Sequence, residues 1–330
     1  IISPWNYPLV LSICDALPAI LAGNTVVVRP DSQTPWSAIR GLNLLSQAGL
    51  PEGVITIVTG EGNSTGTALI DEVDYVCFTG STNTGKIVAA QAGARLIGAS
   101  LELGGKNPMI VCADANLETF LEVAVRGCFT SAGQLCVSIE RMYIHESIYE
   151  KFLSAFVEKV NDLKLGAQLG WGYDVGSLVT DALVNRVSDA VSTAVAQGAK
   201  VETGGKLRTD IGPNVYEPTV LTGVTKDMKI STEEIFGPCC HIAPFDTEEE
   251  AIALANNTTY GLATSVWTEN IGRAHRMAEA IEVGLCWINS WFLRDLRTPF
   301  GGAKGSGIGR EGGVHSLEFY TELRNVCVKL

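Results

Sequence analysis

The sequence predicts an α/β protein of about two domains, in which strands and helices alternate to form parallel sheets. Three observations predict this class. The chain has 330 residues, roughly twice the length of an ordinary domain. Hydrophobic residues make up 46% of it and charged residues 18%, so a large core can be buried. Short β-branched segments alternate with longer amphipathic ones, which is typical of parallel strands joined by crossover helices.

The first hundred residues predict four strands besides a short one at Ile1-Ile2. Pro8 near a first turn and Gly23 after a last one predict a single helix from Pro8 to about Leu21. The pattern then predicts, in order, a strand over 25–28, a helix over 35–49, a strand over 54–58, a short helix over 66–71, a strand over 75–79, a helix from 86 and a strand around 102.

The pattern changes after Glu102, and a second domain with a boundary near residue 104 is expected. Asp181 is expected to cap a helix that ends at Gly198, and Thr247 to open a capping box. The remaining expected elements are strands over 108–111, 141–144, 260–267 and 284–289 and helices over 117–129, 149–163 and 270–281. Residues 320–330 alternate like a strand, whose edge must be covered or paired with a partner chain.

Composition excludes several classes of function. The formal charge of −12 and the pI of about 4.9 argue against a nucleic-acid-binding face, which must be basic. The longest apolar stretch, 7–22, contains two prolines and an aspartate, so no membrane span is expected. Nine cysteines without a C-x-x-C pair indicate reduced thiols in a cytoplasmic protein, and four scattered histidines offer no metal site.

One cysteine and one carboxylate are candidates for catalysis. Cys136 follows a Gly-Gln step after the apolar run 120–129, and Glu102 lies in an apolar strand that breaks on two glycines. A nucleophilic thiol with a base elsewhere in the chain is the arrangement of covalent catalysis. Most cysteines only pack in cores, so the residues alone leave both interpretations open.

Three loops are candidates for ligand binding. Gly80-Ser81 ends a strand and opens a helix, where backbone N–H groups favour an anion; an ordinary turn is the alternative. Glu234 and Phe236 lie between strands and suit a sugar hydroxyl and a flat ring; a solvated acidic turn beside a core phenylalanine is the alternative. The segment 299–312 holds six glycines, which indicates a close approach of its backbone to another group.

Six motifs together resemble the aldehyde dehydrogenase superfamily in residue type, order and spacing, over nearly the whole chain. They are Pro4-Trp5-Asn6, Phe78-Thr79-Gly80-Ser81, Glu102-Leu103-Gly104-Gly105-Lys106, Gly133-Gln134 with Cys136, Glu234-Ile235-Phe236-Gly237-Pro238 and Pro299-Phe300-Gly301-Gly302. The resemblance implies a Rossmann-like cofactor domain over 1–104, a catalytic domain over 105–312 and an oligomerisation strand within 313–330. It also implies a further N-terminal segment before Ile1, and a homodimer or homotetramer.

The resemblance also implies the chemistry. Cys136 attacks an aldehyde carbonyl, and the Asn6 amide and the Cys136 backbone N–H stabilise the oxyanion. Hydride leaves to the cofactor, and Glu102 then acts as general base in hydrolysis of the thioester. Lys106 is expected either to set the polar surroundings of Glu102 or to be structural. The residues implied at the cofactor, NAD or NADP, are Pro4, Trp5, Arg29, Ser32, Gly62, Gly80, Ser81, Glu234 and Phe236.

Two positions bear on the choice of cofactor. Where the family usually has lysine this chain has Arg29, and where NAD-preferring members often have glutamate it has Ser32. A cation beside a small neutral residue attracts a 2′-phosphate without the carboxylate that repels it. We therefore expect NADP to be accepted, and preferred to NAD, although Asp31 opposes this.

The substrate expectation rests on two different resemblances. Residues 1 to about 225 resemble succinate-semialdehyde dehydrogenases. The part from Trp291 onwards resembles 2-hydroxymuconic and 2-aminomuconic semialdehyde dehydrogenases. A divergent subfamily or a recombined gene would explain this difference between the two parts. Both groups oxidise aldehydes that carry a carboxylate, for which Arg294 is the expected ligand. The alternative for Arg294 is an ion pair with Asp295. Trp291 and Phe300 are the other expected substrate residues.

Two other functions fit the same residues less well. Cys136 and Glu102 could serve a thioesterase or acyltransferase without a cofactor, but the Gly80-Ser81 loop and Glu234 argue against it. A non-catalytic protein on the same fold would not need the complete set of catalytic positions. A broad-specificity aliphatic or aromatic aldehyde dehydrogenase is the alternative within the family.

Overall fold

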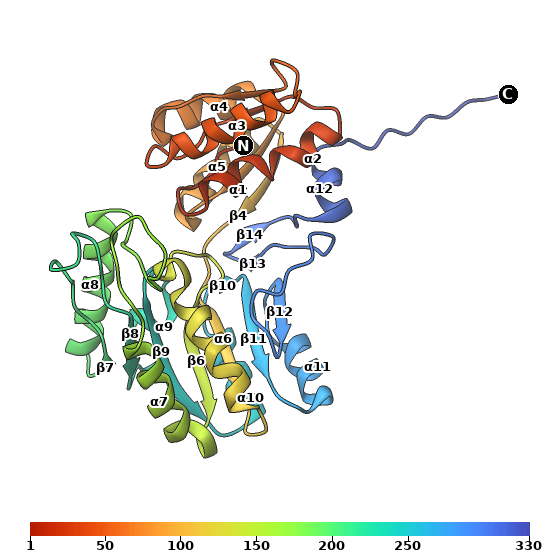
Figure 1. Ribbon diagram of the computed structural model, residues 1–330. Helices are drawn as coiled ribbons and strands as arrows, with labels where there is room; N and C mark the ends of the chain where they lie inside the picture. The colour runs from red at the N-terminus through yellow and green to blue at the C-terminus, as the bar shows by residue number, and fades with distance from the viewer. The chain divides into compact units, whose positions relative to one another are not determined.

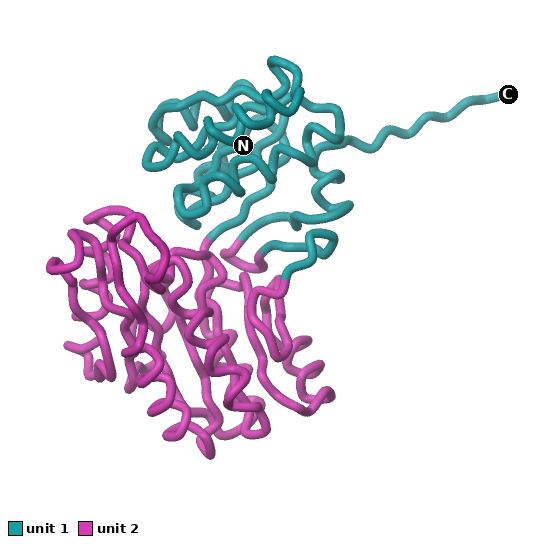
Figure 2. Tube along the Cα trace, in the orientation of Figure 1, with its two compact units in different colours: residues 1–103, 294–301, 307–330 teal, residues 104–293, 302–306 magenta.

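A computed structural model describes all 330 residues and divides the chain into two compact units (Figure 2). Unit 1 comprises residues 1–103, 294–301 and 307–330, and unit 2 comprises 104–293 and 302–306. Unit 1 first ends at residue 103, beside the expected boundary near residue 104, and the roles expected for the two domains stay predictions. Residues 294–301 and 307–312, expected in the second domain, instead belong to unit 1, because β14 (Gly307–Ile308) pairs with a strand of its sheet.

Unit 1 is built on a parallel sheet with one antiparallel edge. β1 (Val26–Val28) pairs in parallel with β2 (Ile55–Ile57), and β3 (Tyr75–Thr79) pairs in parallel with β4 (Gly98–Glu102). Ile2 bridges in parallel to Arg29 and to Phe78, so it joins the two pairs. β14 pairs antiparallel with β4. The expected parallel sheet is confirmed.

Seven helical segments belong to unit 1 (Figure 1). These are α1 (Pro8–Ile13), α2 (Ala16–Leu21), α3 (Pro35–Gln47), η1 (Gly62–Gly66), α4 (Thr67–Glu72), α5 (Thr82–Ala94) and α12 (Gly313–Phe319). The single helix expected over 8–21 is wrong. Pro18 has no N–H and its ring opposes the carbonyl of Cys14, so the chain breaks between α1 and α2. α5 begins at Thr82 rather than Lys86, because the Ser81 hydroxyl accepts from the Thr84 N–H.

Unit 2 contains a seven-stranded sheet in the order β12-β11-β5-β6-β9-β8-β7. The strands are β12 (Leu285–Ile288), β11 (Ala263–Trp267), β5 (Asn107–Val111), β6 (Ile139–His145), β9 (Cys239–Phe245), β8 (Thr219–Thr222) and β7 (Lys200–Thr203). All neighbours are parallel except β7, at the edge. The strand expected over 260–267 is two, because β10 (Tyr260–Gly261) pairs instead with β13 (Ala303–Lys304).

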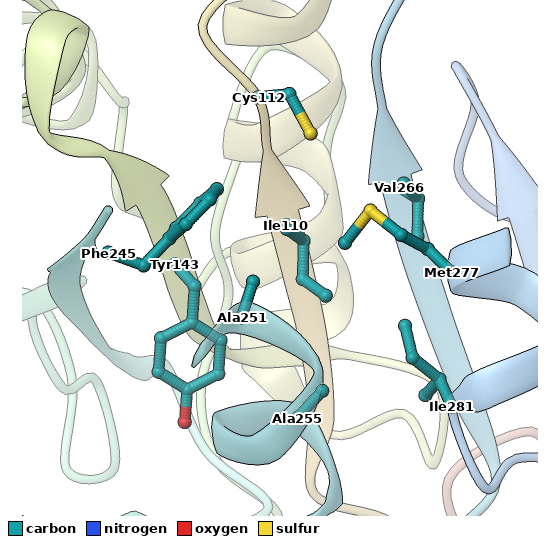
Figure 3. Packing of buried hydrophobic residues seen from close by; sticks show 9 residues of the cluster. All are labelled: Ile110, Cys112, Tyr143, Phe245, Ala251, Ala255, Val266, Met277 and Ile281. Atoms are coloured by element: carbon teal, nitrogen blue, oxygen red, sulfur yellow. The ribbon is translucent and has the colours of Figure 1, made fainter. Parts of the chain in front are cut away.

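Helices cover both faces of this sheet. Figure 3 shows Ile110 of β5 facing Ala251 and Ala255 of α10 (Glu248–Asn256), together with Met277 of α11 (Ile271–Ala280) and Ile281, which directly follows that helix. On the other face, Phe120 of α6 (Leu117–Phe129) packs against Phe152 of α7 (Glu146–Asn161) with ring centroids 5.1 Å apart, and Phe152 packs against Phe156 of the same helix at 5.3 Å. Burial on both sides explains why these strands are apolar throughout.

The remaining helical segments of unit 2 are η2 (Thr130–Gly133), α8 (Asp181–Ala196) and α9 (Lys229–Thr232). Asp181, expected to cap α8, is its first helical residue. Thr180 is the cap, and its hydroxyl accepts from the Leu183 N–H at 3.2 Å. Asn270 and Thr247 cap α11 and α10 in the same way.

Residues 321–330 form no regular secondary structure and pair with no strand of this chain (Figure 1). Leu323, Val326 and Val328 are exposed along this tail. Its pairing with a second chain stays a prediction. All nine cysteines are free thiols. The chain has no helix with the length and apolar character that crossing a membrane requires.

Candidate active site

The candidate residues of unit 1 lie at one edge of its sheet. Parallel strands end at the same edge, and ligands bind there in open α/β sheets. Residues 4–6 follow Ile2, Arg29 follows β1, Gly62 lies in the segment after β2, residues 80–81 follow β3, and Glu102 ends β4. Ser32 is exposed in the loop after Arg29. The sheet thus brings to one edge residues that are up to about one hundred positions apart in sequence.

The turn at Gly80-Ser81 has the geometry of an anion site. Ser81 is exposed at the N-terminus of the 13-residue helix α5. Gly80 is required, because a Cβ there would lie 2.6 Å from Cζ of Phe78. The first N–H groups of a helix and its dipole favour a negative charge, so this turn fits a cofactor phosphate.

Arg29 is more constrained than the sequence indicates. Its guanidinium donates from Nε and Nη2 to the Gly60 carbonyl at 3.0 and 2.7 Å, and only 5% of the residue is exposed. Asp31 accepts from the Gln33 N–H at 2.9 Å within the same loop. Arg29 therefore brings a positive charge to the 60–62 turn, but two of its five donors already hold the chain.

Glu102 is a buried carboxylate with glycine against it. Only 6% of the residue is exposed. A Cβ on Gly301 would lie 2.7 Å from its Oε1, so at this position the glycine-rich segment approaches another group closely, as predicted, and that group is Glu102. Burial, followed by the charges of Glu311 and Asp15, raises the pKa of Glu102 well above its usual value, while Arg310 and Arg294 oppose the rise. This direction is the one expected for a general base.

Glu311 and Asp15 were not singled out by sequence analysis. Burial raises the pKa of Glu311 to about 7, with Arg294 acting against the rise. The pKa of Asp15 is raised well above its usual value, mainly by burial and then by Glu311. Antiparallel backbone hydrogen bonds of 2.7 and 2.6 Å join Glu311 to Phe300. Only the fold brings these distant positions together, so no local pattern could identify them.

Arg294 lies on the face of Phe300, with its guanidinium carbon 4.1 Å from the ring centroid. The alternative pairing with Asp295 is not found, because Asp295 pairs with Arg297 at 2.5 Å. Arg294 itself is exposed and has no ion-pair partner. An exposed, ring-supported guanidinium that forms no direct ion pair is suited to binding a carboxylate, although its charge also acts on Glu102 and Glu311.

In unit 2 the candidates lie at the amino ends of neighbouring strands. Cys136 precedes β6 and follows η2, in which Ser131, Ala132 and Gly133 all have positive φ. A Cβ on Gly133 would lie 2.1 Å from the Gly237 carbonyl oxygen, so only glycine fits. The Gln134 side chain accepts from the Val179 N–H at 2.9 Å and donates to the Ser131 carbonyl at 3.0 Å. The Gly-Gln step therefore builds the turn that presents the thiol.

Two side chains hold the backbone at Cys136 and directly after it. Asn107, which sequence analysis did not single out, donates to the Cys136 and Ser138 carbonyls, each at 2.7 Å. Trp291, an expected substrate residue, is buried and donates its indole N–H to the Val137 carbonyl at 3.0 Å. Trp291 thus supports the segment between the nucleophile and β6.

Lys106 pairs with a residue that has no expected role. Its Nζ lies 2.5 Å from Glu140 Oε2, with 0% of the lysine and 4% of the glutamate side chain exposed. Glu234 accepts from the Gly105 N–H at 2.8 Å, and a Cβ on Gly104 would lie 2.6 Å from its Oε2. Burial, and then the charge of Glu140, raises the pKa of Glu234 to about 7. Charged residues in an apolar strand, as at Glu140-Arg141, could have indicated such a pairing.

Comparison with known proteins decides the family. The profile described as "Aldehyde dehydrogenase family" matches residues 1–326. The chain belongs to the aldehyde dehydrogenase family. Its α/β fold is that of solved members: over 97% of its length it matches a betaine aldehyde dehydrogenase of Staphylococcus aureus in complex with NAD+, with a TM-score of 0.93 and 38% identity. It matches an indole-3-acetaldehyde dehydrogenase complexed with NAD+ over 100% of its length, with a TM-score of 0.96 and 39% identity.

Curated relatives of this aldehyde dehydrogenase chain fall in the two groups that it resembles. It is 47% identical to the 2-hydroxymuconic semialdehyde dehydrogenase of Pseudomonas putida, covering 100% of this chain and 69% of that protein. It is 46% identical to a Mycolicibacterium smegmatis protein with the provisional name succinate-semialdehyde dehydrogenase (NADP+), covering 99% of this chain and 64% of that protein. The chain thus spans about two thirds of the length of these relatives. It covers 64% and 68% of the two solved structures.

Proposed function

We propose that this protein oxidises an aldehyde to a carboxylic acid with NAD or NADP, through a thiohemiacetal and a thioester on Cys136. The observation that carries the proposal is the turn before Cys136. This turn has three consecutive residues with positive φ, and its glycine lies against a backbone carbonyl. The Gln134 side chain also binds the backbone on both sides of the turn, at Ser131 and Val179. All these features serve to present one thiol. A cysteine that only packed in a core would need none of them.

The chain's own groups then act in order. The Cys136 thiolate attacks the carbonyl carbon, and the Asn6 amide and the Cys136 N–H stabilise the oxyanion, each contributing about 3 kcal/mol. The cofactor, when bound, accepts the hydride. Glu102 removes a proton from the water that hydrolyses the thioester, and its raised pKa makes it a stronger base for that proton. Lys106 acts through Glu140 rather than on the substrate.

The cofactor residues are Ser81 with Gly80 for a phosphate, Glu234 for ribose hydroxyls and Phe236 for the nicotinamide side, with Pro4, Trp5 and Gly62 around them. Relatives with NADP+ in their name and neighbours with bound NAD+ support use of either dinucleotide. Arg29 beside the neutral Ser32 favours NADP. A ratio of kcat/KM for NADP over NAD above one is expected, and a ratio of one or less contradicts the preference.

The substrate is an aldehyde that carries a carboxylate, of the succinate semialdehyde or 2-hydroxymuconic semialdehyde type. Arg294 binds the carboxylate, and Phe300 and Trp291 are the other proposed substrate residues. The exposed guanidinium, free of the Asp295 pair and supported by Phe300, supports this class over plain aliphatic aldehydes.

A substrate panel with both cofactors tests the proposal. Absorbance of NADH or NADPH should appear at 340 nm with succinic, glutaric and muconic semialdehydes, and kcat/KM should exceed that for simple aldehydes by at least about tenfold. Thioester hydrolysis without any nicotinamide absorbance would favour the cofactor-free alternative. Equal rates with all aldehydes would favour a broad-specificity enzyme.

The protein acts as a homodimer or homotetramer in the cytoplasm, with the 321–330 tail pairing between chains. The exposed alternating apolar residues of the tail support that pairing. Deleting residues 321–330 should shift the mass measured by light scattering to that of a smaller species.

A further inference from the structure

The carboxylate of Glu140 is enclosed at the amino ends of three strands of unit 2. Glu140 lies in β6, four residues after Cys136, and only 4% of its side chain is exposed. On one side it meets Lys106, which directly precedes β5. On the other it meets the loop 233–238, which leads into β9.

Backbone amides of that loop converge on the carboxylate. The Ile235 N–H donates to both oxygens at 3.0 Å, and the Phe236 N–H donates to Oε1 at 2.9 Å. Lys106 Nζ lies 2.5 Å from Oε2. A buried carboxylate is stable only with such partners, and these charge-assisted hydrogen bonds are stronger than neutral ones.

The loop needs this support because it is held in an uncommon conformation. Phe236 has a φ of 60°, which is unfavourable for a residue with a side chain. Gly237 has no room for a side chain, since a Cβ there would lie 2.4 Å from Val187. Such a conformation persists only where the surroundings hold it. Glu140 binds the N–H groups of two consecutive peptide units, Glu234–Ile235 and Ile235–Phe236, so it fixes the direction of that segment.

We propose that Glu140 is a positioning residue, which with Lys106 as counter-ion holds Glu234 and Phe236 in the arrangement that the dinucleotide requires. This rests on the proposed function, which assigns those two residues to the cofactor. Glu140 reaches the cofactor only through the loop. The charge of Glu140 also raises the pKa of Glu234, so the same carboxylate influences the proton on the ribose ligand.

Two double variants test the hydrogen-bond acceptor of Glu140 while the charge at positions 106 and 140 is kept equal. Both carry Lys106→Met, which removes the lysine that would otherwise remain buried without its partner. The first adds Glu140→Gln, whose amide oxygen can still accept from Ile235 and Phe236. The second adds Glu140→Leu, which has similar size but no acceptor. The two proteins have the same charge and differ only in whether the loop amides have a partner.

The Leu double variant should bind NADH and NADPH at least 20-fold more weakly than the Gln double variant, measured by quenching of nucleotide fluorescence. KM for the nucleotide should rise by the same factor, while kcat at saturating nucleotide should differ by less than about threefold. The rate at which iodoacetamide alkylates Cys136 without nucleotide should be equal in the two. The exposed Glu158→Gln variant serves as the surface control and should match the wild type.

Equal nucleotide affinity in the two double variants overturns the inference, and so does a difference in alkylation rate as large as the difference in affinity. If the Leu variant does not fold, Glu140→Asp replaces it, because its shorter side chain withdraws from the amides and keeps the charge. That variant should bind nucleotide at least fivefold more weakly than the wild type, and unchanged binding contradicts the inference. If the wild type binds neither nucleotide, the proposed function fails first.

Discussion

At the scale of the residue, the most informative groups are carboxyls whose protonation the fold has shifted. Glu102, Glu311 and Asp15 all lie in unit 1; the charge of Glu311 raises the pKa of both Glu102 and Asp15, and the charge of Asp15 raises the pKa of Glu102. Three carboxyls this close cannot all ionise at the same pH, because each negative charge opposes the next. Their protons are therefore lost in successive steps, and the base Glu102 belongs to a coupled set.

The first prediction concerns the pH profile of kcat. Glu102 acts as a base only when ionised, and its pKa lies well above the ordinary value of 4.5. Activity should thus rise with pH through the raised pKa and fall on acidification before the pH at which an ordinary glutamate is protonated. Glu311→Gln removes one opposing charge and should move the rise to lower pH.

Steady-state kcat measured from pH 5 to pH 9 checks this. Glu102→Gln should lower kcat by at least about 100-fold and abolish the rise, since general-base catalysis contributes factors of this size. A burst of NADH or NADPH should remain, because acylation of Cys136 does not need this base. An unchanged profile in Glu311→Gln would show that the two carboxyls titrate independently.

The second prediction concerns Arg294. Replacing it with Met keeps a side chain of similar length on the Phe300 ring but removes the charge that would hold the substrate carboxylate. KM for semialdehyde acids should rise at least about 30-fold, while KM for aliphatic aldehydes should change less than about threefold, because a charge-assisted pair contributes roughly 2 kcal/mol. Arg297→Met, which removes the nearby Asp295 pair instead, is the matched control. A uniform change for all aldehydes would remove the assignment.

At the scale of the element, sequence patterns predicted those helices and strands that depend mainly on interactions between residues close in sequence. The strands at 26–28 and 75–79 and the helix at 117–129 follow from β-branched runs and 3.6-residue periodicity, and all three are found. The break before Ala16 was missed although Pro18 gives the reason for it. The roles of Asn107, Glu140 and Glu311 could not be predicted, since each acts on backbone or charge that only the fold brings near.

The motif residues were predictable as positions but not as geometry. Gly133-Gln134 identified the loop of the nucleophile, yet the contact that demands glycine, at the Gly237 carbonyl, is over one hundred residues away. The same applies to Gly301, whose neighbour is the Glu102 carboxylate. A sequence motif indicates that a position requires a small residue, whereas the structure shows which neighbouring atom excludes a larger side chain.

The third prediction belongs to the turn η2. Gly133→Ala places a Cβ within 2.1 Å of a backbone oxygen and at a φ of 71°. Because backbone cannot move aside cheaply, the variant should lose at least about 2 kcal/mol in free energy of unfolding. Alkylation of Cys136 should also change in rate. Gly93→Ala is the control, since nothing lies within 4 Å of its Cβ position in α5, and it should be neutral or slightly stabilising.

At the scale of the whole molecule, each unit collects its candidate residues at one edge of its sheet. In unit 1 they follow the carboxyl ends of β1 to β4, and in unit 2 they precede β5, β6 and β9. In both places buried carboxylates replace apolar packing. Buried carboxylates contribute to function at the expense of stability. This cost can be measured as a dependence of the free energy of unfolding on pH.

The fourth prediction is that part of the folding stability is lost as pH rises. The pKa of Glu234 in the folded protein is about 7, against the ordinary value of 4.5. Between these values the folded state binds the proton more tightly than the unfolded chain. The contribution is complete below the unfolded pKa and disappears as pH rises through about 7. Its size is at most about 3 kcal/mol, since one pKa unit corresponds to roughly 1.4 kcal/mol.

Urea unfolding of the wild type and Glu234→Gln at pH 5 and pH 8 isolates this contribution. Gln retains an oxygen that can accept from the Gly105 N–H but cannot lose a proton. The variant should therefore lose less free energy of unfolding between the two pH values than the wild type does, by about 1 to 3 kcal/mol. Glu158→Gln, on the surface of α7, should follow the wild type. If Glu234→Gln loses as much free energy of unfolding between the two pH values as the wild type and Glu158→Gln do, Glu234 is ionised in the folded protein at neutral pH. It would then bind ribose as a carboxylate without a change of protonation.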